Sequence, residues 1–285
     1  MSDIQSINNA HFNKTAQDYD SFPQAKELTE RAAETIVQEF IASAGPERAK
    51  NAIALDFGCG TGLCAFKVAP HVKEIVGVDA SEGMTQHLNH KLTTQDENKA
   101  IRDSIKTVTH LVTQNEPLPE PERSQYLAGA NGGFDLIYSS YVMHHIEDIQ
   151  GTIDTLAQKL VKKDGWVIII DFQGPHHHHH HHHEGDGEHE KHGEHSSEGH
   201  GHGHGHNHNH GHSHGDISNS LFVDENGNPL DYVAHKQGFT SEGLTEVFKK
   251  AGLVDVSART AFGMSRELFG KKIWADVLVI KGRRA

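Results

Sequence analysis

The stretch Ala54-Leu55-Asp56-Phe57-Gly58-Cys59-Gly60-Thr61-Gly62 decides the fold, because an apolar run passes directly into three alternating glycines. Short apolar runs bounded by glycine are typical of buried strands in a parallel sheet. Such sheets bind nucleotide-like ligands beyond the carboxyl ends of their strands. Glycine is required where a backbone closely approaches a ligand, because a Cβ would block the approach. The stretch therefore predicts a ligand-binding loop at the end of a strand.

A carboxylate follows this loop at an informative distance. The apolar run 75–78 ends in Asp79, seventeen residues after Gly62. A carboxylate at the end of the second strand can accept two hydrogen bonds from the vicinal hydroxyls of a ribose. Dinucleotide-binding folds require the glycine spacing G-x-G-x-x-G/A, but residue 63 is Leu. The spacing therefore disfavours a nicotinamide oxidoreductase.

Apolar periodicity along the rest of the chain alternates between strand and helix patterns. Strands alternating with helices predict a doubly wound, seven-stranded, mostly parallel sheet. We expect the last two strands to pair antiparallel, because only a nine- or ten-residue loop joins them. The region 116–133 reads as a loop. Predicted strands cover 52–57, 75–79, 105–113, 134–138, 166–171, 254–262 and 273–281, and predicted helices cover 26–41, a segment capped by Ser81, 149–161, and a segment capped by Thr240 or Ser241.

The motif LDFGCGTG at 55–62 resembles the first motif of class I S-adenosylmethionine-dependent methyltransferases. The resemblance covers 12–172 and 217–281. It implies a Rossmann-like fold whose sheet ends in an antiparallel strand, and S-adenosylmethionine as the cofactor. The chain would therefore be a methyltransferase, with a small molecule as the methyl acceptor.

The resemblance also implies a role for each matching residue. Asp56 would orient the glycine loop or meet the amino group of the cofactor, and Asp79 would hold its ribose. Asn115 or Glu116 would replace the acidic residue that reads the adenine amino group. The other expected cofactor-binding residues are Gly58, Cys59, Gly60 and Gly62 of the loop, and Ala80, Ser81 and Met84 near the adenosine.

Two further segments resemble parts of such enzymes. The segment Ser139–Ile146 contains His144 and His145, and one of these imidazoles would act as a general base or substrate anchor. In the alternative interpretation, both histidines simply pack the loop. The N-terminal segment 12–20 would fold over the cofactor, with Phe12 and Tyr19 excluding water from the sulfonium. Its alternative is a helix that packs on the sheet.

A histidine tract interrupts the predicted fold. Nineteen of the 27 histidines lie between 176 and 214. A glycine- and histidine-rich chain buries little apolar area, so we expect disorder there. Neutral imidazole binds zinc, nickel and copper, so an alternative function of the chain is metal buffering or sensing. Without a metal role, the tract is a tolerated repeat expansion in a surface loop. The expected ligands are His200, His202, His204, His206, His208, His210, His212 and His214.

The predicted organisation is one catalytic domain with two additions. A cofactor-covering segment spans 1–22, the domain core 23–173, the histidine-rich insertion 174–216, and the rest of the same domain 217–285. A formal net charge of −13 argues against a nucleic-acid partner. Two cysteines and no apolar run long enough to cross a bilayer indicate a reducing cytoplasmic or nuclear location without a membrane partner. The sequence leaves the oligomeric state open.

Overall fold

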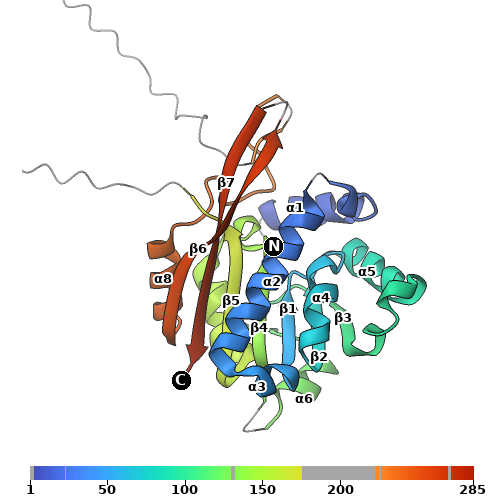
Figure 1. Ribbon diagram of the computed structural model, residues 1–285, viewed down its shortest axis with the longest axis vertical. Helices are drawn as coiled ribbons and strands as arrows, with labels where there is room; N and C mark the ends of the chain where they lie inside the picture. Colours follow the sequence, from blue (N-terminus) through green and yellow to red (C-terminus); the bar gives the residue numbers. More distant parts are fainter. Residues whose placement is uncertain (1–2, 23, 130–131, 175–221, 225, 269–270) are drawn as a thin grey trace, which may run out of the picture.

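The computed structural model describes residues 3–22, 24–129, 132–174, 222–224, 226–268 and 271–285. Seven strands form one sheet in the order β3-β2-β1-β4-β5-β7-β6 (Figure 1). Strands β1 to β5 pair in parallel, and β7 runs antiparallel to both β5 and β6. The predicted doubly wound sheet is confirmed. Its strands are β1 (Ile53–Phe57), β2 (Glu74–Asp79), β3 (Ile105–Thr109), β4 (Phe134–Ser140), β5 (Val161–Phe172), β6 (Leu253–Leu268) and β7 (Lys271–Arg284).

Helices cover both faces of the sheet and make three layers. One apolar cluster joins α2, α4 and α5 to one face, and a second joins α6, α7 and α8 to the other. The central strands are buried on both sides, which explains their near-continuous apolar runs. The helices are α1 (Asp3–Thr15), α2 (Ala25–Ala44), α3 (Pro46–Lys50), α4 (Leu63–Val68), α5 (Glu82–Thr94), α6 (Glu122–Leu127), α7 (Ile149–Thr155) and α8 (Ser241–Lys250).

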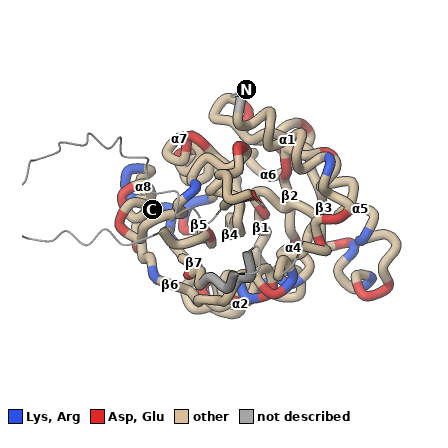
Figure 2. Tube along the Cα trace, turned by 90° about the horizontal axis from the view of Figure 1, so that it is seen from above, with Lys and Arg blue, Asp and Glu red and all other residues tan. Residues whose placement is uncertain are grey.

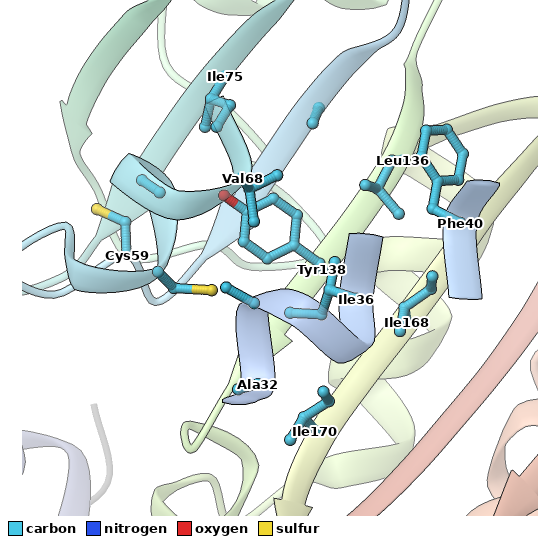
Figure 3. Packing of buried hydrophobic residues seen from close by; sticks show 14 of the residues in the cluster. Ala32, Ile36, Phe40, Cys59, Val68, Ile75, Leu136, Tyr138, Ile168 and Ile170 are labelled. Carbon is cyan, nitrogen blue, oxygen red and sulfur yellow. The ribbon is translucent and has the colours of Figure 1, made fainter. Parts of the chain in front are cut away.

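Helix α2 illustrates how the sequence builds the first layer. Its apolar side chains recur every three or four residues, so they form one stripe. Ala32, Ile36 and Phe40 are buried, and in Figure 3 they lie over Leu136, Ile168 and neighbouring side chains of the sheet. Burying a side chain the size of Ile36 or Phe40 contributes about 1.5–3 kcal/mol. Helix α2 is therefore a main anchor of this face.

The strand order places a ligand crevice at the centre of the sheet. Strand β1 lies between β2 and β4, so the chain winds outward from it in opposite directions. A crevice forms beyond the carboxyl ends of the strands at such a reversal. Gly58, Asp79 and Tyr141 follow or end β1, β2 and β4 respectively, and therefore meet at this edge.

The last two strands are longer than predicted, and the expected loop between them is wrong. The ladder between β6 and β7 continues from Gly263↔Asp276 to Leu268↔Lys271, past the end of β5. The resulting hairpin arm projects beyond the sheet (Figure 1). Its base rests on α2, because Arg31 donates to the Gly263 carbonyl at 3.1 Å and lies 4.1 Å above the Phe262 ring.

Smaller boundaries also differ from the predictions. Strand β3 ends at Thr109, because a turn closed by Thr113 and Glu116 follows it. The region expected as a loop contains α6, and α7 passes at Leu156 into one π-helical turn. The predicted helix starts are confirmed, since Ser81 caps α5 and Thr240 caps α8, each accepting a backbone N–H three residues ahead.

Charge is spread around the molecule. Figure 2 shows acidic and basic residues interspersed around the rim. Within the described residues, no helix combines the length and apolar character needed to cross a membrane.

Candidate active site

A pocket opens at the carboxyl edge of the central strands. Together with the open solvent at its mouth, the pocket encloses about 920 Å³. It lies where β1, β2 and β4 end, with α1 as its other wall. The lining residues are Gln5, Asn8, Asn9, Phe12, Tyr19, Phe57, Gly58, Gly60, Val78, Asp79, Ala80, Ser81, Met84, His110, Leu111, Val112, Ser140, Tyr141, Val142, His145, Ile146 and Thr152.

Asp79 is held rigidly at the floor of this pocket. Its Oδ2 accepts the Gly60 N–H at 2.9 Å, and its Oδ1 accepts the Ser81 N–H at 2.8 Å. Burial raises the pKa of the carboxyl group, and the two backbone donors partly oppose that rise. Each oxygen keeps a further lone pair, so the group can also accept hydrogen bonds from a ligand.

The glycine loop has the backbone shape that its sequence predicts. Gly58, Gly60 and Gly62 all have positive φ, at 76°, 52° and 87°. A Cβ on Gly58 would lie 2.4 Å from Val142, and one on Gly62 would lie 2.7 Å from Leu88. A Cβ on Gly60 would meet no atom within 4 Å. Since Gly60 lines the pocket, a side chain there would take space from a ligand.

Asp56 does not reach the pocket, so direct contact between its carboxyl group and a ligand there is not supported. Its residue is 1% exposed, and neither carboxyl oxygen has a hydrogen-bond partner among the described residues. Burial raises its pKa to about 8, the neighbouring Tyr138 hydroxyl lowers it, and Asp79 raises it further. Asp56 thus lies outside the pocket lining, and of its two expected roles only that of orienting the glycine loop remains.

Three other expected cofactor contacts also lie outside the pocket lining. Cys59 is buried against Gly77, whose added Cβ would touch its side chain at 3.0 Å. Gly62 begins α4 and packs on Leu88. Asn115 is exposed in the turn after β3.

The wall after β3 is formed earlier in the chain, by His110, Leu111 and Val112. His110 bonds through Nε2 to the Glu116 carbonyl at 2.8 Å, so that nitrogen carries the proton. Apolar side chains at 111 and 112 give this wall a surface suited to a flat ring.

The N-terminal segment contributes Phe12 and Tyr19 to the pocket lining. Tyr19 lines the pocket, and burial together with Asp79 raises its pKa to about 12. Asp20 joins this segment to the domain, pairing with Lys91 at 2.5 Å and accepting from the Thr61 hydroxyl at 2.5 Å. Asn13 adds a second attachment, because its Oδ1 accepts the Gly83 N–H at 2.9 Å.

The two adjacent histidines have different surroundings. His144 is 4% exposed and outside the pocket lining; its Nδ1 lies 2.7 Å from Asp171 and its ring stacks on Phe222 at 4.4 Å. His145 lines the pocket, with Nδ1 3.0 Å from the Tyr232 carbonyl. Burial lowers the pKa of His145 well below its usual value, and His144 lowers it further. His144 is thus a packed residue, and His145 is the candidate for chemistry.

Sequence reasoning missed the polar face of α1. Gln5, Asn8, Asn9 and Phe12 all line the pocket, and their spacing of three and four residues places them on one helix face. That spacing was available in the sequence. The predicted covering segment, 1–22, includes the three amides, but the prediction names only Phe12 and Tyr19 as covering side chains.

The predicted metal ligands at 200–214 lie outside the described residues. Within the part of the chain that the structure describes, no group of three or more His, Cys, Asp or Glu side chains is arranged to hold a metal ion.

Comparison of the sequence with family profiles matches one profile, described as a methyltransferase domain, over residues 28–258. An uncharacterized methyltransferase of Bacillus subtilis, YcgJ, is 28% identical over 42% of this chain and 41% of its own length. An uncharacterized methyltransferase of Schizosaccharomyces pombe is 32% identical over 41% of this chain and 37% of its own. The matched regions thus span about two fifths of these curated relatives.

Solved structures share the fold across nearly the whole chain. A magnesium protoporphyrin IX methyltransferase from Synechocystis with bound S-adenosylhomocysteine gives a TM-score of 0.55 at 14% identity, covering 99% of this chain and 100% of that one. The crystal structure of YcgJ gives 0.51 at 13% identity, covering 88% and 98%.

Proposed function

The chain belongs to the methyltransferase-domain family, and on that premise we propose that it transfers a methyl group from S-adenosylmethionine to a small-molecule acceptor. One observation carries the proposal. The Asp79 carboxylate and the Gly60 amide, from the ends of neighbouring parallel strands, are bonded to each other and line the same pocket. The Asp79 carboxylate would accept hydrogen bonds from a ribose there, beside the Gly60 backbone, which a ligand can approach closely.

The residues present fit the cofactor. Asp79 would accept hydrogen bonds from the ribose hydroxyls with its remaining lone pairs. Met84, Leu111 and Val112 would enclose the adenine between apolar side chains. The open space above Gly60 would receive the methionine portion, because no Cβ fills it.

The same pocket has a second side for the acceptor. His145 follows β4, and Asp79 ends β2, with β1 between them. The ends of β2 and β4 are two strand spacings of about 4.8 Å apart. The acceptor would therefore lie between α1 and the segment after β4, with the cofactor on the β2 side.

When bound, S-adenosylmethionine supplies an electrophilic methyl group on a sulfonium, which is a good leaving group. The protein mainly has to align the acceptor with that methyl group, and such positioning alone can lower a barrier by several kcal/mol. Phe12 and Tyr19 would keep water from the reacting atoms. For an O–H or N–H acceptor, His145 Nε2 would take the proton as the new bond to carbon forms.

Calorimetry with S-adenosylhomocysteine and, separately, with NAD tests the proposal. We expect one molecule of S-adenosylhomocysteine per chain and no heat of binding with NAD. Methyl transfer from radiolabelled cofactor into fractions of a metabolite extract would then identify the acceptor by a mass gain of one methylene. Binding of NAD in place of S-adenosylhomocysteine would reject the proposal.

A further inference from the structure

Asn8 of α1 lines the pocket and contains a buried hydrogen-bond acceptor. The residue is 4% exposed, and its Nδ2 donates to the His145 carbonyl at 3.1 Å. A carbonyl oxygen can only accept, so the nitrogen of the amide must face it. The other end, Oδ1, is buried without a partner among the described residues. Leaving such an atom unpaired is unfavourable, and a ligand with a donor would relieve that cost.

His145 places a second acceptor in the same wall. The Tyr232 carbonyl, 3.0 Å from Nδ1, requires that nitrogen to carry the proton. The neutral ring then holds a lone pair on Nε2. The Asn8 amide holds the backbone of this histidine, so the two acceptors belong to adjacent side chains.

The charges and shapes around these acceptors narrow the ligand class. None of the lining residues is Lys or Arg, and the one carboxylate, Asp79, lies on the cofactor side. An anionic acceptor would therefore lose its hydration without gaining a cation. Phe12 meets the His145 ring edge-on at 5.0 Å, and Tyr141 lines the wall after β4. These surfaces suit a flat apolar skeleton.

We propose that the methyl acceptor is a neutral, planar molecule with an O–H or N–H group donated to Asn8 Oδ1, and that Asn8 is a specificity-determining residue. The inference rests on the proposed function, because it assigns the acceptor side of the same pocket. Asn8 is bonded to the backbone of His145, so a group held by Asn8 would lie on the same wall as His145, whose Nε2 would receive the proton of the group that is methylated. A molecule of equal shape without a donor leaves Oδ1 unpaired and is disfavoured.

Pairs of ligands that differ only in the donor test this selection. The probes are phenol against fluorobenzene, catechol against ortho-difluorobenzene, and benzoate as the anionic ring, each titrated by ligand-observed NMR into protein saturated with S-adenosylhomocysteine. We expect the hydroxylated member of each pair to bind about three- to tenfold more tightly, the worth of one hydrogen bond. Benzoate should bind more weakly than phenol. Equal binding within both pairs, or no binding of either phenol or catechol, would overturn the proposal.

Two variants on the same helix locate the effect. Asn8→Leu should abolish the preference for hydroxylated rings while leaving affinity for S-adenosylhomocysteine within about twofold. Ala10→Leu is the control on the same helix, because Ala10 is exposed and outside the pocket lining; it should keep the preference. A preference that survives in Asn8→Leu would refute the role of Asn8.

If Asn8→Leu does not fold, the ligand pairs titrated into wild-type protein still test whether the pocket selects a hydrogen-bond donor. Failure of wild-type protein to bind S-adenosylhomocysteine would reject the proposed function itself. Intact binding of S-adenosylhomocysteine without donor selection would reject only the assignment of the acceptor.

Discussion

Replacing Asp79 by asparagine removes the group that we expect to hold the ribose. The carboxylate accepts one backbone N–H on each oxygen, from Gly60 and from Ser81. An asparagine has one oxygen, so either orientation turns its NH₂ group toward one of these donors. The negative charge that strengthens hydrogen bonds to a ligand is lost as well.

A hydrogen bond to a charged group is worth about 1.5–3 kcal/mol, and about 1.4 kcal/mol corresponds to a tenfold change in affinity. Asp79→Asn should therefore weaken S-adenosylhomocysteine binding about 10- to 150-fold in calorimetry. Asp103→Asn changes an exposed acid outside the pocket lining and should bind like wild type. Affinity of Asp79→Asn within twofold of wild type, in a folded protein, would refute the assignment of this carboxylate.

Three other substitutions probe the covering segment, the base and the buried acid. Asp20→Ala leaves the Lys91 ammonium buried without its partner and should lower the free energy of unfolding in urea by about 3 kcal/mol. The double variant Asp20→Ala/Lys91→Met should regain most of that loss. Equal losses in the single and the double variant would contradict the role of this ion pair. His145→Asn keeps a donor for the Tyr232 carbonyl but removes Nε2, so methyl transfer to an O–H acceptor should fall about 100-fold or more with little change in cofactor affinity. In wild type, since the pKa of His145 is lowered, activity should persist on acidification to about pH 6.5, the usual histidine pKa; an acid limb above that value would argue against this base. With a pKa of about 8, Asp56 keeps its proton in the folded state over a pH range where the unfolded chain loses it near pH 4. The free energy of unfolding of wild type should therefore fall, relative to that of Asp56→Asn, as the pH rises from 4 to 8. A difference that stays independent of pH in urea titrations would exclude the raised pKa.

The cofactor side of the pocket could be predicted from sequence because its determinants are local. A strand, a glycine loop and an acid at the next strand end appear in order along the chain. Parallel strands then bring their carboxyl ends to one edge without further information. This is why the sequence could predict that Gly60 and Asp79 lie at the same pocket.

The acceptor side depends on contacts that no local pattern encodes. Asn8 reaches the pocket because α1 is fixed over it, through Asn13 bonded to Ser81 and His11 stacked on Tyr232 at 3.9 Å. These partners are distant in sequence. Without an alignment or a structure, nothing in the segment distinguishes Asn8 from its neighbour Asn9.

Two element boundaries differ from the predictions. The predicted third strand runs to 113, which would bring Asn115 to the adenine, whereas β3 ends at Thr109 and His110 lines the pocket. The sequence predicts a loop where the hairpin arm lies, because nothing local marks the strand pairing that extends it. Among the described side chains of the arm, Met264 and Ala275 are buried and Trp274 is exposed.

A crystal structure of the chain with S-adenosylhomocysteine tests the cofactor assignment most directly. We expect the ribose hydroxyls within hydrogen-bond distance of Asp79, the adenine between Met84 and Leu111, and the sulfur directed toward the side of the pocket formed by Asn8 and His145. A ligand bound elsewhere, or a pocket that stays empty at saturating concentration, would contradict it.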